Sequence, residues 1–237
     1  MGAKLSPRAL VGIALGGAVL LTAILITASL VSSTESAPTP TPAPQAAATE
    51  GDGLLSNIPQ DGIALGRPDA PVTLVEYADL QCPYCADWAR DAFPTVVDEY
   101  VASGKVRVEF RGLAFLGPDS DKALRAALAA AEQDGLWNVV HGLFTSQGAE
   151  NSGWVTDGLL RSLGREAGID AGRMFAQTHT PAVERELAAA QAAAQRVGVP
   201  GTPFFQAGPT GGALEPLRAS SLDADAFRAE LDRLLQP

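Results

Sequence analysis

Cysteine and histidine are scarce in this chain, and their scarcity narrows the chemistry open to it. The 237 residues include two cysteines, Cys82 and Cys85, and two histidines, His141 and His179. A structural zinc site usually takes four ligands, and the histidines lie far from the cysteines and 38 residues apart. We therefore predict no metal site and no cofactor. Because two residues separate the cysteines, a disulfide between them closes too small a ring to be an effective structural staple.

Lysine is equally rare. Lys4, Lys105 and Lys122 are the only lysines, and the formal net charge is −10. No basic cluster follows the extreme N-terminus, and no aromatic-and-basic pattern is present that would bind a phosphate backbone. An acidic surface of this kind keeps a protein soluble and repels polyanions, so we exclude nucleic acid as a partner.

One long apolar run lies near the N-terminus. Residues 9–31 are 23 consecutive apolar or small residues, enough to span a hydrocarbon core of about 30 Å. Lys4 and Arg8 precede the run and the next basic residue is Arg67, so the positive-inside rule places residues 1–8 in the cytoplasm. A cleaved signal peptide is the alternative, although its apolar part is normally shorter, about 7–15 residues. We predict a single-pass cell-membrane anchor, with the N-terminus in the cytoplasm and the rest of the chain after residue 31 extracytoplasmic.

The composition then changes over residues 32–60, which are rich in proline, alanine and threonine and nearly free of apolar residues before Leu54. Such a segment cannot bury enough surface to offset the entropy of ordering it, which predicts a disordered linker. Residues 61–237 have the apolar content of one globular domain. In an exported domain, paired cysteines can stay oxidised.

Strand and helix patterns alternate at the start of this domain. Residues 72–78, VTLVEYA, are mostly apolar and β-branched, which predicts a buried central strand. Residues 83–104 have helical spacing, with a kink expected at Pro94. The alternation in 105–112, KVRVEFRG, predicts a second strand with one wetter face.

Helical texture dominates the next part, residues 119–197, and a short strand over 213–217 and a last helix follow. The order is strand, helix, strand, a block of helices, and then strand, strand, helix. We therefore predict an α/β domain with a helical insertion at about 113–198.

The cysteine pair lies where the predicted central strand gives way to the predicted helix. At a helix N-terminus, free N–H groups and the helix dipole would stabilise a Cys82 thiolate and lower its pKa. Cys85, one turn later, would be less exposed and would resolve a mixed disulfide formed at Cys82. Pro83 suits the first helical turn, and Tyr84 lies where it can tune the hydrogen bonding of the sulfur. This placement favours a redox disulfide, while copper(I), which accepts two thiolates, stays open as an alternative.

Two further features fit a redox site. Glu76 lies within an apolar strand, where a carboxylate is costly without a partner or a role. We favour a buried acid that relays a proton to or from Cys85 over a solvated glutamate at a sheet edge. The second feature is Thr202–Pro203, which precedes a strand and can form a cis bond at modest cost.

Together, APVTLVEYADLQCPYC (70–85), the helical block and VGVPGTPFF (197–205) resemble the thioredoxin superfamily, and specifically its DsbA-like disulfide oxidoreductases. The resemblance covers about residues 61–237 and implies a thioredoxin fold. It implies that Cys82 is the nucleophile, that Cys85 resolves, and that Glu76 is a buried acid. It also implies that Thr202 and cis-Pro203 bind the substrate, and we add Tyr84 to these substrate-binding residues.

Three functions follow from these residues. The first is an anchored thiol–disulfide oxidoreductase that oxidises cysteine pairs of exported proteins; the resemblance implies a membrane quinone-linked reoxidase as its partner. The second is a reductase or isomerase in the same compartment, since CPYC is also the pattern of glutaredoxins. The third is a non-enzymatic copper(I)- or thiol-binding module. No dimerisation domain is visible in the sequence, so we expect a monomer.

The histidines receive structural assignments. We expect His141 on a helix face, partly packed in the core. His179 precedes Thr180 and Pro181, which indicates a turn at the start of a helix.

Overall fold

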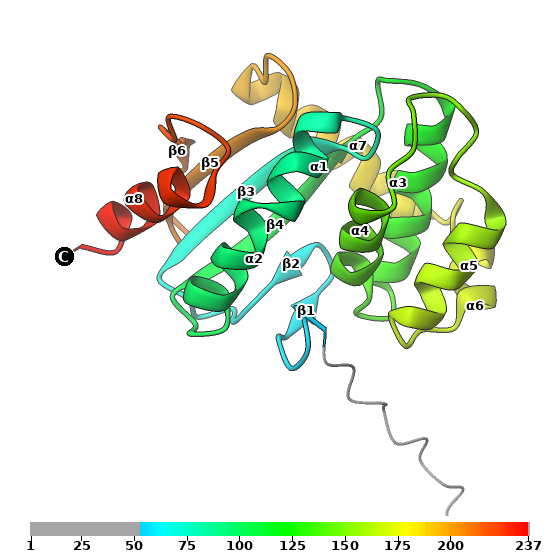
Figure 1. The fold of residues 1–237 in the computed structure, drawn as a ribbon, viewed down its shortest axis with the longest axis horizontal. Helices are drawn as coiled ribbons and strands as arrows, with labels where there is room; N and C mark the ends of the chain where they lie inside the picture. Colours follow the sequence, from blue (N-terminus) through cyan, green and yellow to red (C-terminus); the bar gives the residue numbers. More distant parts are fainter. Residues whose placement is uncertain (1–52, 237) are drawn as a thin grey trace, which may run out of the picture. The chain divides into compact units, whose positions relative to one another are not determined.

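A six-stranded sheet lies at the centre of the computed structural model, which describes residues 53–236 (Figure 1). Its strand order is β1-β2-β4-β3-β5-β6. β3 (Val72–Asp79) pairs parallel with β4 (Val106–Leu113) and antiparallel with β5 (Phe204–Pro209). The outer strands are two residues each: β1 (Gln60–Asp61), β2 (Ala64–Leu65) and β6 (Glu215–Pro216). The predicted α/β domain is confirmed.

Both strand predictions are confirmed in their burial as well as their position. Every residue of β3 is buried, because the strand lies between two neighbours and both faces of the sheet are covered. Along β4, buried and half-buried residues alternate. The half-buried side is charged, and there Glu109 forms ion pairs with Arg107 and Arg111.

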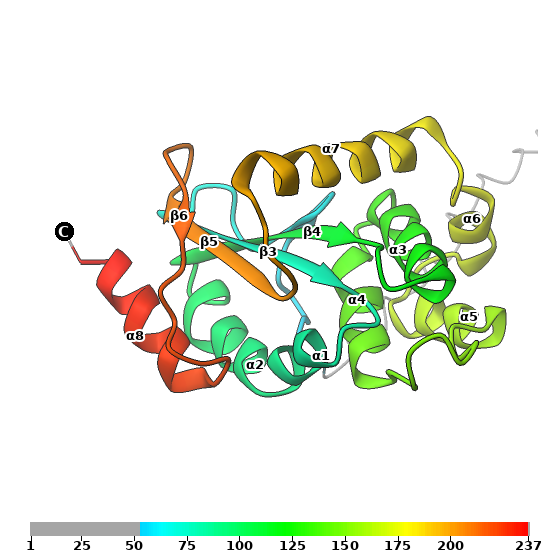
Figure 2. The same cartoon turned by 90° about the horizontal axis from the view of Figure 1, so that it is seen from above.

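Helices cover the two faces of the sheet (Figure 2). One face carries α1 (Pro83–Arg90), α2 (Ala92–Val96), the short π-helix η1 (Val97–Val101) and α8 (Ala224–Leu234). The predicted kink at Pro94 takes the form of a break at Asp91, between α1 and α2. Proline lacks an N–H, and its ring clashes with the carbonyl four residues earlier, which is that of Arg90.

The predicted helical insertion lies between β4 and β5. Four of its helices gather beyond the carboxyl ends of β3 and β4 in Figure 2: α3 (Pro118–Ala131), α4 (Leu136–Thr145), α5 (Asp157–Glu166) and α6 (Ala171–Ala176). The fifth, α7 (Pro181–Val197), behaves differently. Its Ala190 and Ala194 pack against Val75, Tyr77 and Leu113, so α7 forms the layer on the second face of the sheet.

The folded domain begins before residue 61. Leu55 is buried in the main core, and the side chain of Gln60 accepts a hydrogen bond from the backbone N–H of Trp137 at 3.0 Å. Residues 53–60, which we predicted to be part of the linker, therefore belong to the domain. The predicted span 9–31 lies outside the described residues. Within 53–236 no helix combines the length and apolar character needed to cross a bilayer.

Asp79 fixes the end of β3. It is fully buried and accepts four hydrogen bonds, from the backbone N–H groups of Gln81, Phe115 and Leu116 and from the hydroxyl of Ser120. Its carboxylate thus connects the segment before Cys82 to the loop that follows β4 and to the first turn of α3.

Replacing Asp79 with alanine should destabilise the protein strongly, because four donors around a buried site lose their acceptor at once. We expect the free energy of unfolding in guanidinium, followed by circular dichroism, to fall by about 3 kcal/mol or more. Asp69→Ala is the matched control, since Asp69 is 67% exposed and paired with Arg67 at the surface. An Asp79→Ala protein as stable as this control would contradict the assignment.

Candidate active site

The two cysteines lie at the N-terminus of α1. Cys82 is the N-cap residue, with an extended backbone (φ −69°, ψ 120°), and Pro83 takes the first helical position. Cys85, one turn into the helix, is completely buried, whereas Cys82 keeps 5% of its surface exposed. The local sequence explains the geometry, because proline at the first helical position needs no hydrogen-bond acceptor.

The environment of Cys82 stabilises negative charge on its sulfur. The pKa of Cys82 is lowered to about 6, chiefly by a hydrogen bond from the Cys85 thiol, which acts against the opposing effect of burial. The Thr202 side chain and the backbone N–H groups of Cys85 and Tyr84 contribute to the same lowering. These two N–H groups belong to the first helical turn, where backbone donors have no partner within the helix, so their partial positive charge favours a thiolate at the helix N-terminus.

The pKa of Cys85, one turn later, is shifted in the opposite direction. Burial raises the pKa of this thiol, and the hydrogen bond to Cys82 and the nearby Glu76 carboxylate raise it further. Glu76 itself has no exposed surface, which excludes the alternative of a solvated glutamate at a sheet edge. Burial, followed by the charge of Cys82, holds the pKa of Glu76 well above its ordinary value. A buried thiol and a buried acid therefore lie behind the stabilised thiolate.

The loop before β5 closes over the cysteine pair. Thr202–Pro203 is a cis peptide bond, and the Cys82 thiol donates a hydrogen bond to the carbonyl oxygen of Thr202 at 3.2 Å. Two residues after the proline, the ring of Phe205 packs on Trp88 of α1, with centroids 4.8 Å apart. This aromatic contact holds the start of β5 against the helix that carries both cysteines.

The structure thus gathers the residues singled out from the sequence around one helix end. Cys82, Cys85 and Thr202 are linked by hydrogen bonds, and Glu76 acts electrostatically on both sulfurs. Tyr84, between the cysteines, is 63% exposed.

Sequence reasoning missed a second set of polar residues, which hold the segment before α1. Gln147 donates from its amide to the carbonyl oxygens of Leu80 (2.9 Å) and Cys82 (3.2 Å). The side-chain amide of Gln81 donates a hydrogen bond to the side-chain oxygen of Asn151, and the backbone N–H of Asn151 donates one to the side-chain oxygen of Gln81. Gln147 and Asn151 lie 65 and 70 residues from their partners, and nothing in the local sequence distinguishes them from ordinary loop residues.

The remaining titratable groups do not form a metal site within the described residues. Between residues 53 and 236 no group of three or more histidine, cysteine, aspartate or glutamate side chains is arranged so that it could hold a metal ion. His179 contacts Arg125 through Nδ1 (3.3 Å) beside the N-cap Thr180 of α7, as its turn assignment predicted. A stabilised thiolate beside a second thiol is the arrangement that thiol–disulfide exchange uses.

The low pKa of Cys82 depends first on Cys85, so Cys85→Ala should raise it. In the reduced wild-type protein, thiolate absorbance at 240 nm should titrate with a midpoint of about 6, and the variant's midpoint should lie higher. The oxidised protein supplies the baseline. A wild-type midpoint near 9, or identical midpoints in the two proteins, would contradict this account of the thiolate.

The same shift predicts a pH-dependent stability. Because folding lowers the pKa of Cys82 from near 9 to about 6, its contribution is fully present above pH 9 and is lost as the pH falls through 6. Relative to the oxidised protein, the reduced protein should therefore become more stable as the pH rises from 6 to 9. Urea unfolding of both forms across this range measures the difference; a flat difference would show that Cys82 is not stabilised as a thiolate.

Comparison with known proteins agrees with this geometry. The family model described as Thioredoxin matches residues 59–211, which is more than half of the chain. The chain is 31% identical over 144 residues to the probable disulfide bond formation protein D of Bacillus anthracis. The match covers 59% of this chain and 66% of that protein, so the chain spans just under two thirds of the relative's length.

Two solved structures have similar folds. BdbD from Bacillus subtilis, in its oxidised form, gives a TM-score of 0.63 at 23% identity over 76% of this chain and 98% of that one. A thioredoxin-like oxidoreductase from Silicibacter pomeroyi gives 0.57 at 33% identity over 72% of this chain and 90% of that one. The chain therefore belongs to the thioredoxin family, and its fold and relatives place it among the DsbA-like thiol:disulfide oxidoreductases.

Proposed function

We propose that this chain is a dithiol oxidase that donates the Cys82–Cys85 disulfide to cysteine pairs of exported proteins. The observation that carries the proposal is the thiolate-stabilising environment of Cys82 at the N-terminus of α1. Stabilising this thiolate favours the reduced form of the enzyme, and an enzyme whose reduced form is stable is an oxidant.

The geometry supports a two-step exchange. A substrate thiolate attacks Sγ of Cys82, the Cys82–Cys85 bond breaks, and Cys85 leaves as a thiolate. Because burial disfavours charge on Cys85, Glu76 gives it a proton and becomes the buried carboxylate. A second substrate thiolate then attacks the substrate sulfur of the mixed disulfide, and Cys82 leaves as the stabilised thiolate. The substrate has lost two electrons to the enzyme, whose disulfide has become a thiolate and a thiol.

Substrate binding is proposed at the loop before β5. Thr202 and Pro203 lie against Cys82, and the adjoining residues 199–201 line a surface pocket with Leu113 and Phe115. Phe115 (57% exposed) and Tyr84 (63%) are the large apolar side chains that the described domain leaves most exposed. An extended substrate segment in this pocket would contact apolar side chains and bring its cysteine toward Cys82.

The proposed setting follows from the N-terminal sequence. Residues 9–31 would anchor the chain with its catalytic domain outside the cytoplasm, where emerging proteins carry free cysteines. After each turnover the enzyme is reduced, so a membrane quinone-linked reoxidase would have to accept its two electrons. The enzyme is proposed to act as a monomer.

The reduction potential of the purified full-length chain, measured against glutathione, decides the direction of electron flow. We expect a value above about −200 mV, toward the roughly −120 mV of DsbA. Cys85→Ser, which cannot form the disulfide, provides the control for signals unrelated to this couple. A value below about −250 mV, close to thioredoxin, would indicate a reductase instead.

A further inference from the structure

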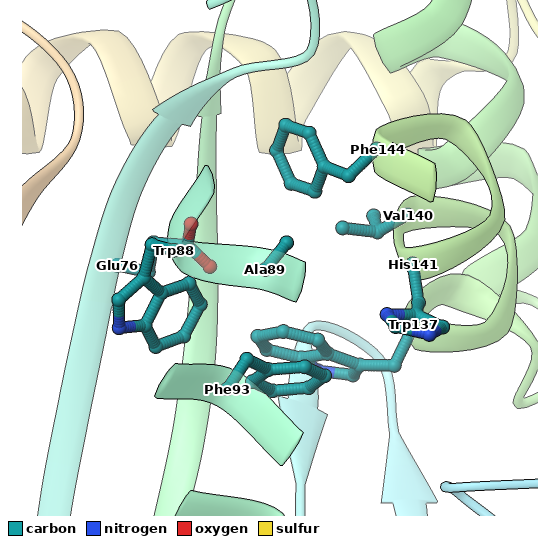
Figure 3. A pocket seen from close by; sticks show the side chains of 8 residues that line it. All are labelled: Glu76, Trp88, Ala89, Phe93, Trp137, Val140, His141 and Phe144. Carbon is teal, nitrogen blue, oxygen red and sulfur yellow. The ribbon is translucent and has the colours of Figure 1, made fainter. Parts of the chain in front are cut away.

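A narrow interior pocket contains unpaired polar groups that the exchange steps leave unexplained. It lies between the middle of β3, α1, α2 and α4, and Figure 3 shows its eight lining side chains. Most of them are aromatic or aliphatic. Two are titratable: Glu76 from β3 and His141 from α4, which lie on opposite sides of the pocket in this view.

Neither titratable group has a hydrogen-bond partner at this pocket. Both carboxylate oxygens of Glu76 and Nδ1 of His141 are buried without a partner in the protein. Nε1 of Trp88, another lining residue, is a fourth buried atom without a partner. Buried polar atoms in folded proteins are almost always hydrogen-bonded, so four unpaired atoms on the residues of one pocket require an explanation. Apolar residues would fill the same space without this cost.

His141 also faces solvent. Its side chain lines a second pocket, a surface groove bordered by Leu54, Asn138 and Glu166. Within the packed interior it contacts the ring of Phe93, with centroids 5.9 Å apart. One imidazole ring therefore separates the interior pocket from the surface groove, and imidazole can accept a proton on one nitrogen while it releases one from the other.

Glu76 connects the other side of the pocket to the chemistry. Ala89, which lines the pocket, lies four residues after Cys85 on α1, so the two residues share a face of the helix. Glu76 acts electrostatically on Cys85. When Cys85 leaves as a thiolate and takes a proton, Glu76 is left as a charged carboxylate with no exposed surface and needs a proton from solvent.

We propose that His141 carries this proton between the surface groove and Glu76. The inference rests on the proposed role of Glu76 as the acid that protonates Cys85. In the oxidising direction, His141 takes a proton from water in the groove at one nitrogen and releases another from Nδ1 into the interior pocket, restoring neutral Glu76. When the enzyme is reoxidised, the proton leaves by the same route.

The transfer needs a bridging water, because no hydrogen bond joins the two groups. The lining side chains leave no space large enough for a whole water molecule. The proposed transfer therefore requires the side chains around Ala89 and Val140 to move apart far enough to admit one.

Other charged groups facing this route are few in the described domain. Cys82 and Cys85 lie on the α1 side, and Glu166 lies across the groove from α5. Arg90 of α1 donates to the carbonyl oxygen of Phe144 near the C-terminus of α4. Of these groups, His141 alone lines both pockets.

A double-mutant cycle on the full chain tests the proposal. The steady-state rate of oxidation of a small dithiol, with excess glutathione disulfide as the reoxidant, is measured for the wild type, Glu76→Gln, His141→Phe and the double variant, because every turnover requires a proton to enter and to leave. Each single variant should be slower by about tenfold or more, and the double variant should be no slower than Glu76→Gln alone. The proposal would be overturned if the double variant were slowed by the product of the two single effects. It would also be overturned if the His141→Phe rate lay within about twofold of the wild-type rate.

Further measurements separate proton transfer from packing. His141→Ala should regain rate with added imidazole but not with pyrazole, which has a similar shape and is a far weaker base; equal recovery with both would indicate a packing role and overturn the proposal. His179→Phe removes the other histidine and should leave the rate unchanged. This cycle reports on proton transfer in either direction of electron flow. A low reduction potential would therefore refute the oxidase while leaving the role of His141 to be decided here.

Discussion

The two cysteine sulfurs lie one turn apart at the start of α1 in surroundings that shift their pKa values in opposite directions, and the active site depends on that difference. At Cys82 the Cys85 thiol, the Thr202 side chain and the N–H groups of the helix N-terminus stabilise negative charge. At Cys85, one turn later, the surroundings are apolar and the same charge is disfavoured. Two chemically identical groups thus acquire different roles: one is a good nucleophile and leaving group, and the other holds its proton tightly.

This asymmetry requires the helix end to be held in place, and the contacts that hold it come from distant parts of the chain. Asp79 ties the segment just before Cys82 to the loop after β4, because it accepts hydrogen bonds from backbone N–H groups in both. Gln147 donates to two backbone carbonyl oxygens of the same segment, those of Leu80 and Cys82. Trp88 and Phe205 hold α1 against the start of β5, which keeps the Thr202 carbonyl at the sulfur. The helical insertion therefore supports the position of the nucleophile in addition to enlarging the domain.

A buried acid creates a second requirement, because a proton given to Cys85 must be replaced. Glu76 is central in a sheet whose faces are both covered, so bulk water does not reach it. The sequence analysis placed His141 on a helix face partly packed in the core, and it is half-buried there against Phe93. Its position between two pockets gives this packing residue a further role in our proposal.

The sequence by itself determined the features that depend on neighbours in the chain. Strand alternation in β4, the break before Pro94 and the cysteine pair at the start of α1 are local patterns, determined by steric and hydrogen-bonding rules over a few residues. Only the tertiary structure decided which side chains lost water and which distant groups met. Long-range packing decided four features: the complete burial of Glu76, the hydrogen bonds of Gln147 and Asn151, the position of α7 on the second face, and the inclusion of residues 53–60 in the domain. Their partners lie far away in the sequence, where no local periodicity records them.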